Sequence, residues 1–203
     1  MLIAAILIGS YLLGSIPFGV IIVKAWKGVD IRQYGSRNIG ATNAMRVVGS
    51  WQAFAVVLAV DALKGLIPVY VGRQVSPSND WLAVACGLAA IVGHSTSVFL
   101  RFRGGKAVAT SLGVIIGLTP PVAAIGFGLW LILVALTKYV SVGSIVTTLT
   151  ILPLMFAFDY PLPVKIFGAV ASIFVLLKHK SNISRLIQGK EPRIGQKVNL
   201  PEG

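Results

Sequence analysis

Acidic residues and cysteine are both scarce in this sequence, and each shortage excludes a class of site. Six Asp and Glu residues and two histidines are scattered along 203 residues, with no carboxylate cluster beside either histidine. A divalent metal site built from protein ligands is therefore not expected. Cys86 is the only cysteine, which excludes an intrachain disulfide and a thiolate metal cluster. We predict neither a metal site nor a cofactor.

Charged residues of either sign are also few. They make up 12% of the chain, whereas 56% of the residues are hydrophobic, and the mean hydropathy is +0.85. A soluble domain of this size needs far more polar surface. Several uncharged stretches of about 17 to 22 residues are long enough to cross a bilayer. The composition predicts an all-α, polytopic membrane protein.

Seven helical segments account for the sequence. They cover approximately residues 2–23, 51–72, 81–100, 107–118, 121–137, 142–158 and 163–177. The fourth is short, because about 12 residues at 1.5 Å each span roughly 18 Å of a hydrocarbon core near 30 Å. We predict that it is a partial span, with Thr119-Pro120-Pro121 as its turn.

The distribution of cations predicts the orientation. If all seven segments cross or enter the membrane with the N-terminus outside, fifteen of the eighteen Lys and Arg residues lie on the inner side. Joining the fourth and fifth segments would export the basic tail, against the positive-inside rule. We therefore expect one membrane-embedded domain over residues 1–203, with a basic cytoplasmic tail from about residue 178 to 203.

The net charge of +12 does not indicate nucleic acid in this context. The cations lie between and after apolar segments, and they are not interleaved with aromatic residues that could stack on bases. We expect membrane lipid as a partner and no nucleic acid.

Small and ionisable residues inside the helical segments predict helix contacts. Ser10/Gly14 and Ser15/Gly19 are pairs of small residues four apart, which allow close approach of two helices. Asp61 and Lys64 are three apart on one helical face, so they can form an ion pair at membrane depth. We interpret this pair as a structural clasp, although a functional role stays open.

The stretch from Phe99 to Thr110 has the features of a phosphate-binding loop. Gly104 and Gly105 allow close approach of the backbone to a ligand, Lys106 adds a mobile positive charge, and a helix begins directly afterwards. The P-loop motif is excluded, because Leu100 and Ala107 stand where that motif needs Gly and Ser or Thr. The alternative is a basic turn that only determines topology.

Three further polar stretches fall on the same predicted side of the membrane: residues 35–46, 138–144 and 178–185. Each alone could be a helix cap, a packing surface or a lipid-headgroup patch. Together they describe a cationic pocket rimmed by glycine, serine and asparagine, which suits a phosphorylated substrate and a lipid-soluble one.

At these residues the chain resembles the bacterial acyl-phosphate:glycerol-3-phosphate acyltransferases over essentially its whole length. The resemblance depends on Gly-Ser-x-Asn-x-Gly-Ala-Thr-Asn-x-x-Arg at residues 35–46, and on Gly-His…Phe…Phe-x-Gly-Gly-Lys…Ala-Thr at residues 93–110. His179-x-x-Asn182-Ile-x-Arg185-Leu and Asp61-x-x-Lys64-Gly65 also match.

The resemblance implies a seven-helix enzyme of the bacterial inner membrane with its active site facing the cytoplasm. It would transfer a fatty acyl group from acyl phosphate to the 1-hydroxyl of sn-glycerol 3-phosphate, giving lysophosphatidic acid and inorganic phosphate in phospholipid biosynthesis. The family's catalytic positions correspond here to Ser36, Arg46, Lys106, His179 and Asn182. We assign substrate binding to Gly35, Asn38, Thr42, Asn43, Gly104, Gly105, Thr110, Ser141 and Ser144.

Some positions depart from the family's usual pattern. Arg37 and Arg101 replace common glycines, and Ala107 replaces a frequent glycine, which makes the geometry of the donor loop the least secure inference. The proton acceptor is either His179 or the substrate's own phosphate, and we favour the phosphate because Lys178 and Lys180 should lower the pKa of His179.

Two other classes of protein are alternatives to an enzyme. A transporter of organic phosphates usually has inverted repeats and a site at the bilayer midplane, and neither half of this sequence mirrors the other. A lipid-binding structural protein would tolerate changes at Ser36 or His179. Whether a soluble enzyme that makes acyl phosphate docks on the basic surface stays open.

Overall fold

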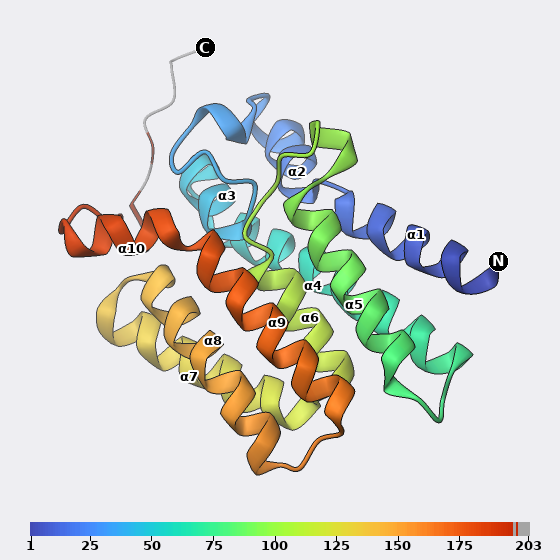
Figure 1. Ribbon diagram of the computed structural model, residues 1–203. Coiled ribbons are helices and arrows are strands. Elements are labelled where there is room, and N and C mark those ends of the chain that lie inside the picture. The colour runs from blue at the N-terminus through green and yellow to red at the C-terminus, as the bar shows by residue number, and fades with distance from the viewer. Residues whose placement is uncertain (197, 199–203) are drawn as a thin grey trace.

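The protein is built from helices that pack side by side. The computed structural model describes residues 1–196 and 198, and within these residues there are ten α-helices, two short 3-10 helices and no strand (Figure 1). Lys197 and residues 199–203 of the predicted basic tail lie outside the described residues. The helices are α1 (Leu2–Ser15), α2 (Phe18–Lys27), η1 (Ile31–Gln33), α3 (Ala41–Val48), α4 (Trp51–Val75), α5 (Asp80–Ser95), η2 (Val98–Leu100), α6 (Val108–Leu118), α7 (Pro120–Thr137), α8 (Val140–Ala157), α9 (Leu162–Lys178) and α10 (Lys180–Ile187). The all-α prediction is confirmed.

Most of these helices are long and apolar enough to cross a membrane. Five segments qualify, and a sixth does if α9 and α10, which are bent by 53° at their junction, count as one span. They are Leu2–Lys27, Trp51–Val75, Asp80–Leu100, Pro120–Thr137 and Val140–Ala157, and then α9 with α10. Helix α6 has only 11 residues, so it is as short as expected. The chain is a multi-pass membrane protein, whereas the number of seven spans stays a prediction.

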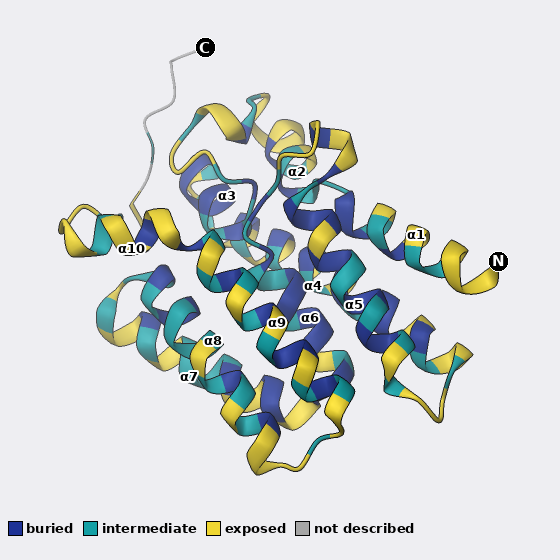
Figure 2. Ribbon diagram, in the orientation of Figure 1, coloured by how far each residue is buried: buried dark blue, intermediate teal, exposed yellow. Residues whose placement is uncertain are grey.

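The outward faces of the helices are apolar. Leu136 is 76% exposed, Leu177 69% and Leu162 65%, and exposed residues follow the outside of the bundle (Figure 2). Exposed hydrophobic area of this extent is typical of a surface covered by lipid.

The first predicted segment is wrong as a single helix, since it consists of α1 and α2. Pro17 lacks a backbone N–H, and it forces the preceding residue out of the helical region, so that Ile16 has φ −59° and ψ 120°. The break leaves the Ile16 carbonyl without a helical partner, and Lys64 Nζ of α4 donates a hydrogen bond of 2.8 Å to this oxygen.

The third predicted segment also ends early. Helix α5 stops at Ser95 rather than continuing to residue 100, because the hydroxyls that follow bond outside the helical ladder. Ser95 Oγ donates to the Gly105 carbonyl at 3.1 Å, and Ser97 Oγ donates to the Ser15 carbonyl at 2.6 Å. The chain then turns through Arg101 and Phe102, which both have positive φ.

Glycines allow the closest helix contacts. A Cβ at Gly14 of α1 would overlap the backbone of Ala90 in α5, and one at Gly113 of α6 would overlap the backbone of Ala62 in α4. The predicted close approach at Ser10/Gly14 is therefore confirmed. Gly19 instead packs against the Ile39 carbonyl in the loop before α3.

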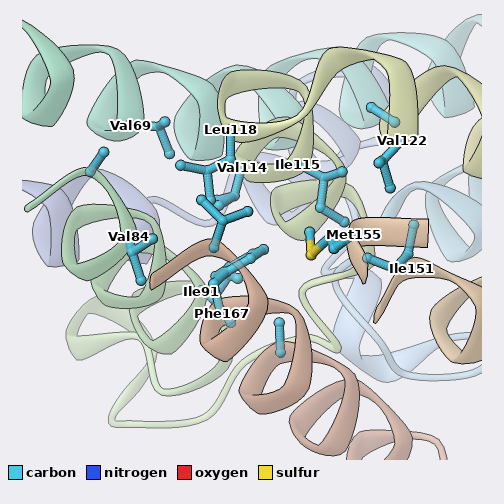
Figure 3. Packing of buried hydrophobic residues seen from close by; sticks show 14 of the residues in the cluster. Val69, Val84, Ile91, Val114, Ile115, Leu118, Val122, Ile151, Met155 and Phe167 are labelled. Carbon is cyan, nitrogen blue, oxygen red and sulfur yellow. The ribbon is translucent and has the colours of Figure 1, made fainter. Parts of the chain in front are cut away.

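The apolar core closes one end of the bundle. Val114, Leu118, Val122, Met155 and Phe167 are each at most 1% exposed and pack together between α4, α5, α6, α7, α8 and α9 (Figure 3). Along α6 the core extends from Ala107, which directly follows Lys106, to Leu118 at the far end of the helix.

Candidate active site

A cavity of about 190 Å³ opens between α3, α4, α6, α7, α8, α9 and α10. Ten of the predicted catalytic and substrate-binding residues line it, and they come from all four polar stretches. They are Ser36, Asn38, Thr42, Asn43, Arg46, Lys106, Ser141, Ser144, His179 and Asn182. The structure thus brings residues from both ends of the chain to one place, while the role of each stays a prediction.

The mouth of the cavity is a hydrogen-bonded group of charged and amide side chains. Lys106 Nζ donates to Asn182 Oδ1, and Asn182 Nδ2 donates to Glu191 Oε1 at 2.6 Å. Arg185 Nε donates to the other carboxylate oxygen, Glu191 Oε2, at 2.7 Å. The amide of Asn182 therefore has a fixed orientation, with its oxygen toward the ammonium group.

Arg46 reaches the same mouth from α3. It is 8% exposed, and its Nη2 donates to the Pro192 carbonyl at 3.1 Å. Its buried Nε has no hydrogen-bond partner among the described residues. A buried donor without a hydrogen-bond partner destabilises the folded protein unless a ligand supplies an acceptor. Arg46 is therefore well placed to bind an anion.

Burial lowers the pKa of Lys106 to about 8, and the neighbouring charges of Arg185 and Arg46 contribute in the same direction, against Glu191. The ammonium group is therefore mostly protonated at neutral pH and loses its charge just above it. A phosphate bound beside Lys106 would favour the charged form.

His179 follows the last residue of α9. Its Nδ1 donates to the Val175 carbonyl at 2.7 Å, since a carbonyl oxygen can only accept, so Nε2 is the acceptor nitrogen. Burial lowers its pKa to about 4, and the charge of Lys106 adds to the effect. The predicted direction is right, but its cause is burial with Lys106 rather than Lys178 and Lys180.

The loop before α3 is organised around Asn43. Its Oδ1 accepts the Ser36 backbone N–H at 2.9 Å, and its Nδ2 donates to the carbonyls of Ile31 (3.2 Å), Tyr34 (3.1 Å) and Asn38 (2.9 Å). All of this amide's atoms are engaged, so Asn43 positions Ser36 at the cavity instead of offering its own groups. Helix α3 begins after Gly40, whose N–H is bonded to Asn38 Oδ1 at 3.0 Å.

Four of the predicted binding residues do not line the cavity: Gly35, Gly104, Gly105 and Thr110. A Cβ at Gly104 would overlap the backbone of His94 and Ser95, and one at Gly105 would overlap the His94 ring. The two glycines let the loop pack on the end of α5, and this packing places Lys106. Gly35 has φ +59°, a turn conformation that suits glycine.

Asp61 and Lys64 form the predicted ion pair, with 2.7 Å between Asp61 Oδ1 and Lys64 Nζ, and both side chains at most 2% exposed. Because Lys64 also bonds the Ile16 carbonyl, the pair joins α4 to the break between α1 and α2. His94 Nδ1 lies 3.8 Å from Asp61 Oδ1, and both residues line the cavity. The sequence spacing did not reveal this contact, because it joins two helices.

Other lining residues were missed in the sequence. Glu191 is the acidic member of the mouth, and its proximity to the basic residues 178–185 was the available signal. Hydrogen bonds from Asn182 and Arg185 outweigh the opposing effect of burial and lower the pKa of Glu191, so it is a carboxylate. Phe54, Phe127 and Trp130 line the inner part, and nothing distinguished them from lipid-facing aromatic residues.

The arrangement of side chains in the cavity agrees with the family of proteins to which this chain is similar. The sequence model of a family described as "Glycerol-3-phosphate acyltransferase" matches residues 4–189. A glycerol-3-phosphate acyltransferase of Synechococcus elongatus is 46% identical over 204 residues, covering 97% of each chain. One from Synechococcus sp. (strain JA-3-3Ab) is 45% identical and covers 94% of this chain and 92% of the relative.

Two crystal structures are also similar. Both are of PlsY (YgiH), an integral membrane glycerol 3-phosphate acyltransferase. Its glycerol 3-phosphate form is 39% identical, with a TM-score of 0.91 over 96% of each chain. Its lysophosphatidic acid form is 38% identical, with a TM-score of 0.89 over 97% of each chain.

Proposed function

Because this chain belongs to the glycerol-3-phosphate acyltransferase family, we propose that acyl phosphate is its donor and the 1-hydroxyl of sn-glycerol 3-phosphate its acceptor. The products are then lysophosphatidic acid and inorganic phosphate, and the reaction belongs to phospholipid biosynthesis. The observation that carries the proposal is a single cavity with cations at its mouth and aromatic and aliphatic side chains inside. Such a cavity suits two phosphorylated ligands, one of which has an acyl chain.

The mouth supplies the groups that bind phosphate. Arg46 offers its unpaired Nε, and Lys106 offers an ammonium group oriented by Asn182. Charge-assisted hydrogen bonds of this kind are about twice as strong as neutral ones. They hold the acceptor and donor phosphates next to each other, so that the hydroxyl and the acyl carbon meet in a reactive geometry.

The chemistry asks little of the protein beyond binding. The glycerol hydroxyl oxygen attacks the acyl carbon, the bond from this carbon to the phosphate oxygen breaks, and phosphate leaves with the electron pair. The cations stabilise the charge that develops on the leaving phosphate. The hydroxyl proton passes to a substrate phosphate, and His179 Nε2, an acceptor that is neutral above its pKa of about 4, is the alternative base.

The orientation follows from the same proposal. We place the N-terminus outside, the tail and the cationic mouth in the cytoplasm, and α6 as the partial span of a seven-segment protein in the bacterial inner membrane. Soluble glycerol 3-phosphate then enters from the cytoplasm, and the lipid product leaves into the bilayer. A soluble enzyme that makes acyl phosphate has access to the basic surface around this mouth.

A donor assay tests the proposal. Purified protein in lipid vesicles is given radiolabelled glycerol 3-phosphate with acyl phosphate, acyl-CoA or acyl-carrier protein. We expect labelled lysophosphatidic acid from acyl phosphate alone. Product from the thioesters and none from acyl phosphate would overturn the donor assignment.

Three alanine variants test the site. We expect Arg46→Ala, Lys106→Ala and Asn182→Ala each to lower kcat/KM by 100-fold or more, because each removes a charged or orienting group from the mouth, and one such group accounts for about 3 kcal/mol. Arg103→Ala is the control, since Arg103 is exposed and does not line the cavity. Normal turnover in all three variants would reject the site.

A further inference from the structure

The inner part of the cavity is mostly apolar and dips into the membrane domain. Below Ser141 and Ser144 the hydroxyls of Ser111, Thr147 and Thr148 stand among a larger number of aliphatic and aromatic side chains of α4, α6, α7 and α8. These are Phe54, Leu58, Leu112, Ile115, Ala123, Phe127, Trp130 and Ile151.

The far end of this inner part is closed. Ile115, Ala123 and Ile151 line it and at the same time belong to the core cluster, together with Val122 and Met155, which are completely buried (Figure 3). A Cβ at Gly126 would come within 2.9 Å of Ile151 Cδ1, so α7 and α8 lie close together at this level.

The closed end limits the depth. Ser144 and Ile151 are seven residues apart on α8, which corresponds to about 10 Å along the helix. A membrane fatty acyl chain spans about half of a hydrocarbon core of roughly 30 Å, or about 15 Å. A chain of that length does not fit between the polar mouth and the core, so its distal part has to leave the cavity sideways.

At the seam between α4 and α7, side chains rather than helix packing close the cavity. Helix α4 packs on α5 and α6, and α7 packs on α6 and α8, but over their described residues α4 and α7 do not pack along one another. The rings of Phe54 and Trp130 close the seam, with centroids 6.3 Å apart and planes inclined by 14°.

The two rings form the layer between the cavity and the outer surface. Both are half-buried and line the cavity, while their sequence neighbours Ala55 and Leu131 are exposed. Trp130 is held from the cavity side, since its Nε1 donates to Ser144 Oγ at 3.2 Å and its ring stacks on Phe127 at 5.9 Å. Phe54 has an edge contact with Trp51 at 5.8 Å, and its ring, unlike that of Trp130, is held by no hydrogen bond.

We propose that the Phe54–Trp130 pair is a lateral opening of the active-site cavity, through which the distal part of a long acyl chain passes between α4 and α7 into the bilayer. The inference rests on the proposed function, because the occupant is the acyl chain of its donor and product. It predicts that changes at this pair affect turnover more strongly as the acyl chain of the donor becomes longer. A short acyl group stays inside the cavity and does not reach the seam.

Chemical cross-linking of the seam tests this inference. The variant Phe54→Cys/Trp130→Cys is made in a Cys86→Ala background, so that the two new thiols are the only ones. A short bifunctional methanethiosulfonate joins them, and the same preparation is assayed with palmitoyl phosphate and with butyryl phosphate, before linking and after reduction. We expect linking to lower the ratio of the palmitoyl rate to the butyryl rate at least tenfold, and reduction to restore it.

The controls separate the seam from other effects. In each single-cysteine variant, treatment with the reagent should leave the palmitoyl-to-butyryl ratio within twofold of the value for the same variant before treatment. An unchanged ratio in the linked protein, or equal losses with both donors, would overturn the lateral opening. Absence of turnover with either donor in the unmodified protein would instead reject the proposed function.

A single substitution gives a second measurement if the double variant does not fold. Phe54→Ala widens the seam, and we expect it to change the palmitoyl-to-butyryl ratio of kcat/KM at least fivefold. Trp51→Ala is the matched control, because Trp51 touches Phe54 and is 59% exposed but does not line the cavity. Equal ratios in the two variants would contradict the proposal.

Discussion

Lys106 is half-buried at the proposed phosphate site, and its burial determines how its charge responds to pH. In the unfolded chain its pKa is near 10.5, and burial lowers it to about 8 in the folded protein. The charge that we propose to bind phosphate is therefore present below pH 8 and is lost as the pH rises through it. Because the unfolded chain binds more protons between these values, stability rises over the same range.

We expect kcat/KM, which reports the free enzyme, to fall above pH 8 with an apparent pKa near that value. Lys106→Arg should remove this alkaline limb while lowering the rate, since arginine stays charged but has a different shape. An acid limb near pH 6 should come from the second ionisation of the substrate phosphate, whose pKa is about 6, and not from His179, which is neutral there. An acid limb that disappears in His179→Gln would contradict the assignment.

Three residues show what the sequence could indicate about backbone conformation and what it could not. Arg37, Arg101 and Ala107 stand where glycine is common in the family, and each has a positive φ of 57°, 53° and 58°, respectively. The departures were visible in the sequence. Their cause, a left-handed conformation that a Cβ disfavours by roughly 1 to 2 kcal/mol, is visible only in the backbone.

At the scale of helices, the hydrophobicity of the sequence predicted where the helices lie better than where they are interrupted. The segments that became α6, α7, α8 and α9 were placed within two residues, because uncharged runs bounded by Pro, Lys or Gly have clear limits. The breaks at Pro17 and after Ser95 were missed. Pro17 was a local signal of the first break, because proline ends or kinks a helix at the preceding residue. The second break depends on a contact with the distant Gly105, which no local pattern marks.

The Gly104–Gly105 loop gives a prediction at this scale. Gly104→Ala places a Cβ against the backbone of His94 and Ser95, so we expect a loss of about 1 to 3 kcal/mol in stability and displacement of Lys106. Thermal unfolding in detergent and kcat/KM should both fall. Gly128→Ala on α7 is the matched control, since its Cβ meets nothing within 4 Å, and it should be neutral or stabilising by up to about 1 kcal/mol.

At the scale of the whole molecule, the positive-inside rule brought the right stretches together. Residues of α3, of the loop before α6, of α8 and of the tail were predicted to lie on one side of the membrane, and they line one cavity. The rule does not predict which individual atoms form hydrogen bonds with one another. The contact between Asn182 and Glu191, nine residues apart, depends on how the tail turns back at Gly189, whose φ is +66°.

Labelling with a membrane-impermeant maleimide tests the orientation. In intact spheroplasts we expect Asp159→Cys to react, while Arg37→Cys, Arg103→Cys and Lys190→Cys react only after permeabilisation, because seven segments place these three inside. Cys86 is buried and should stay silent. Reaction of Lys190→Cys from outside, with Arg103→Cys protected, would show that α6 does not reverse the chain.

The hydrogen bonds among Lys106, Asn182 and Glu191 also set an order of events during synthesis. Ser36 and Arg46 leave the ribosome before the partners that complete the cationic mouth, because Asn182 and Glu191 follow them by well over a hundred residues. A nascent chain halted before residue 180 therefore carries the cations of the proposed phosphate site without the amide and carboxylate that orient them. If the proposed site is right, catalysis begins only once α10 has folded back onto the inserted bundle.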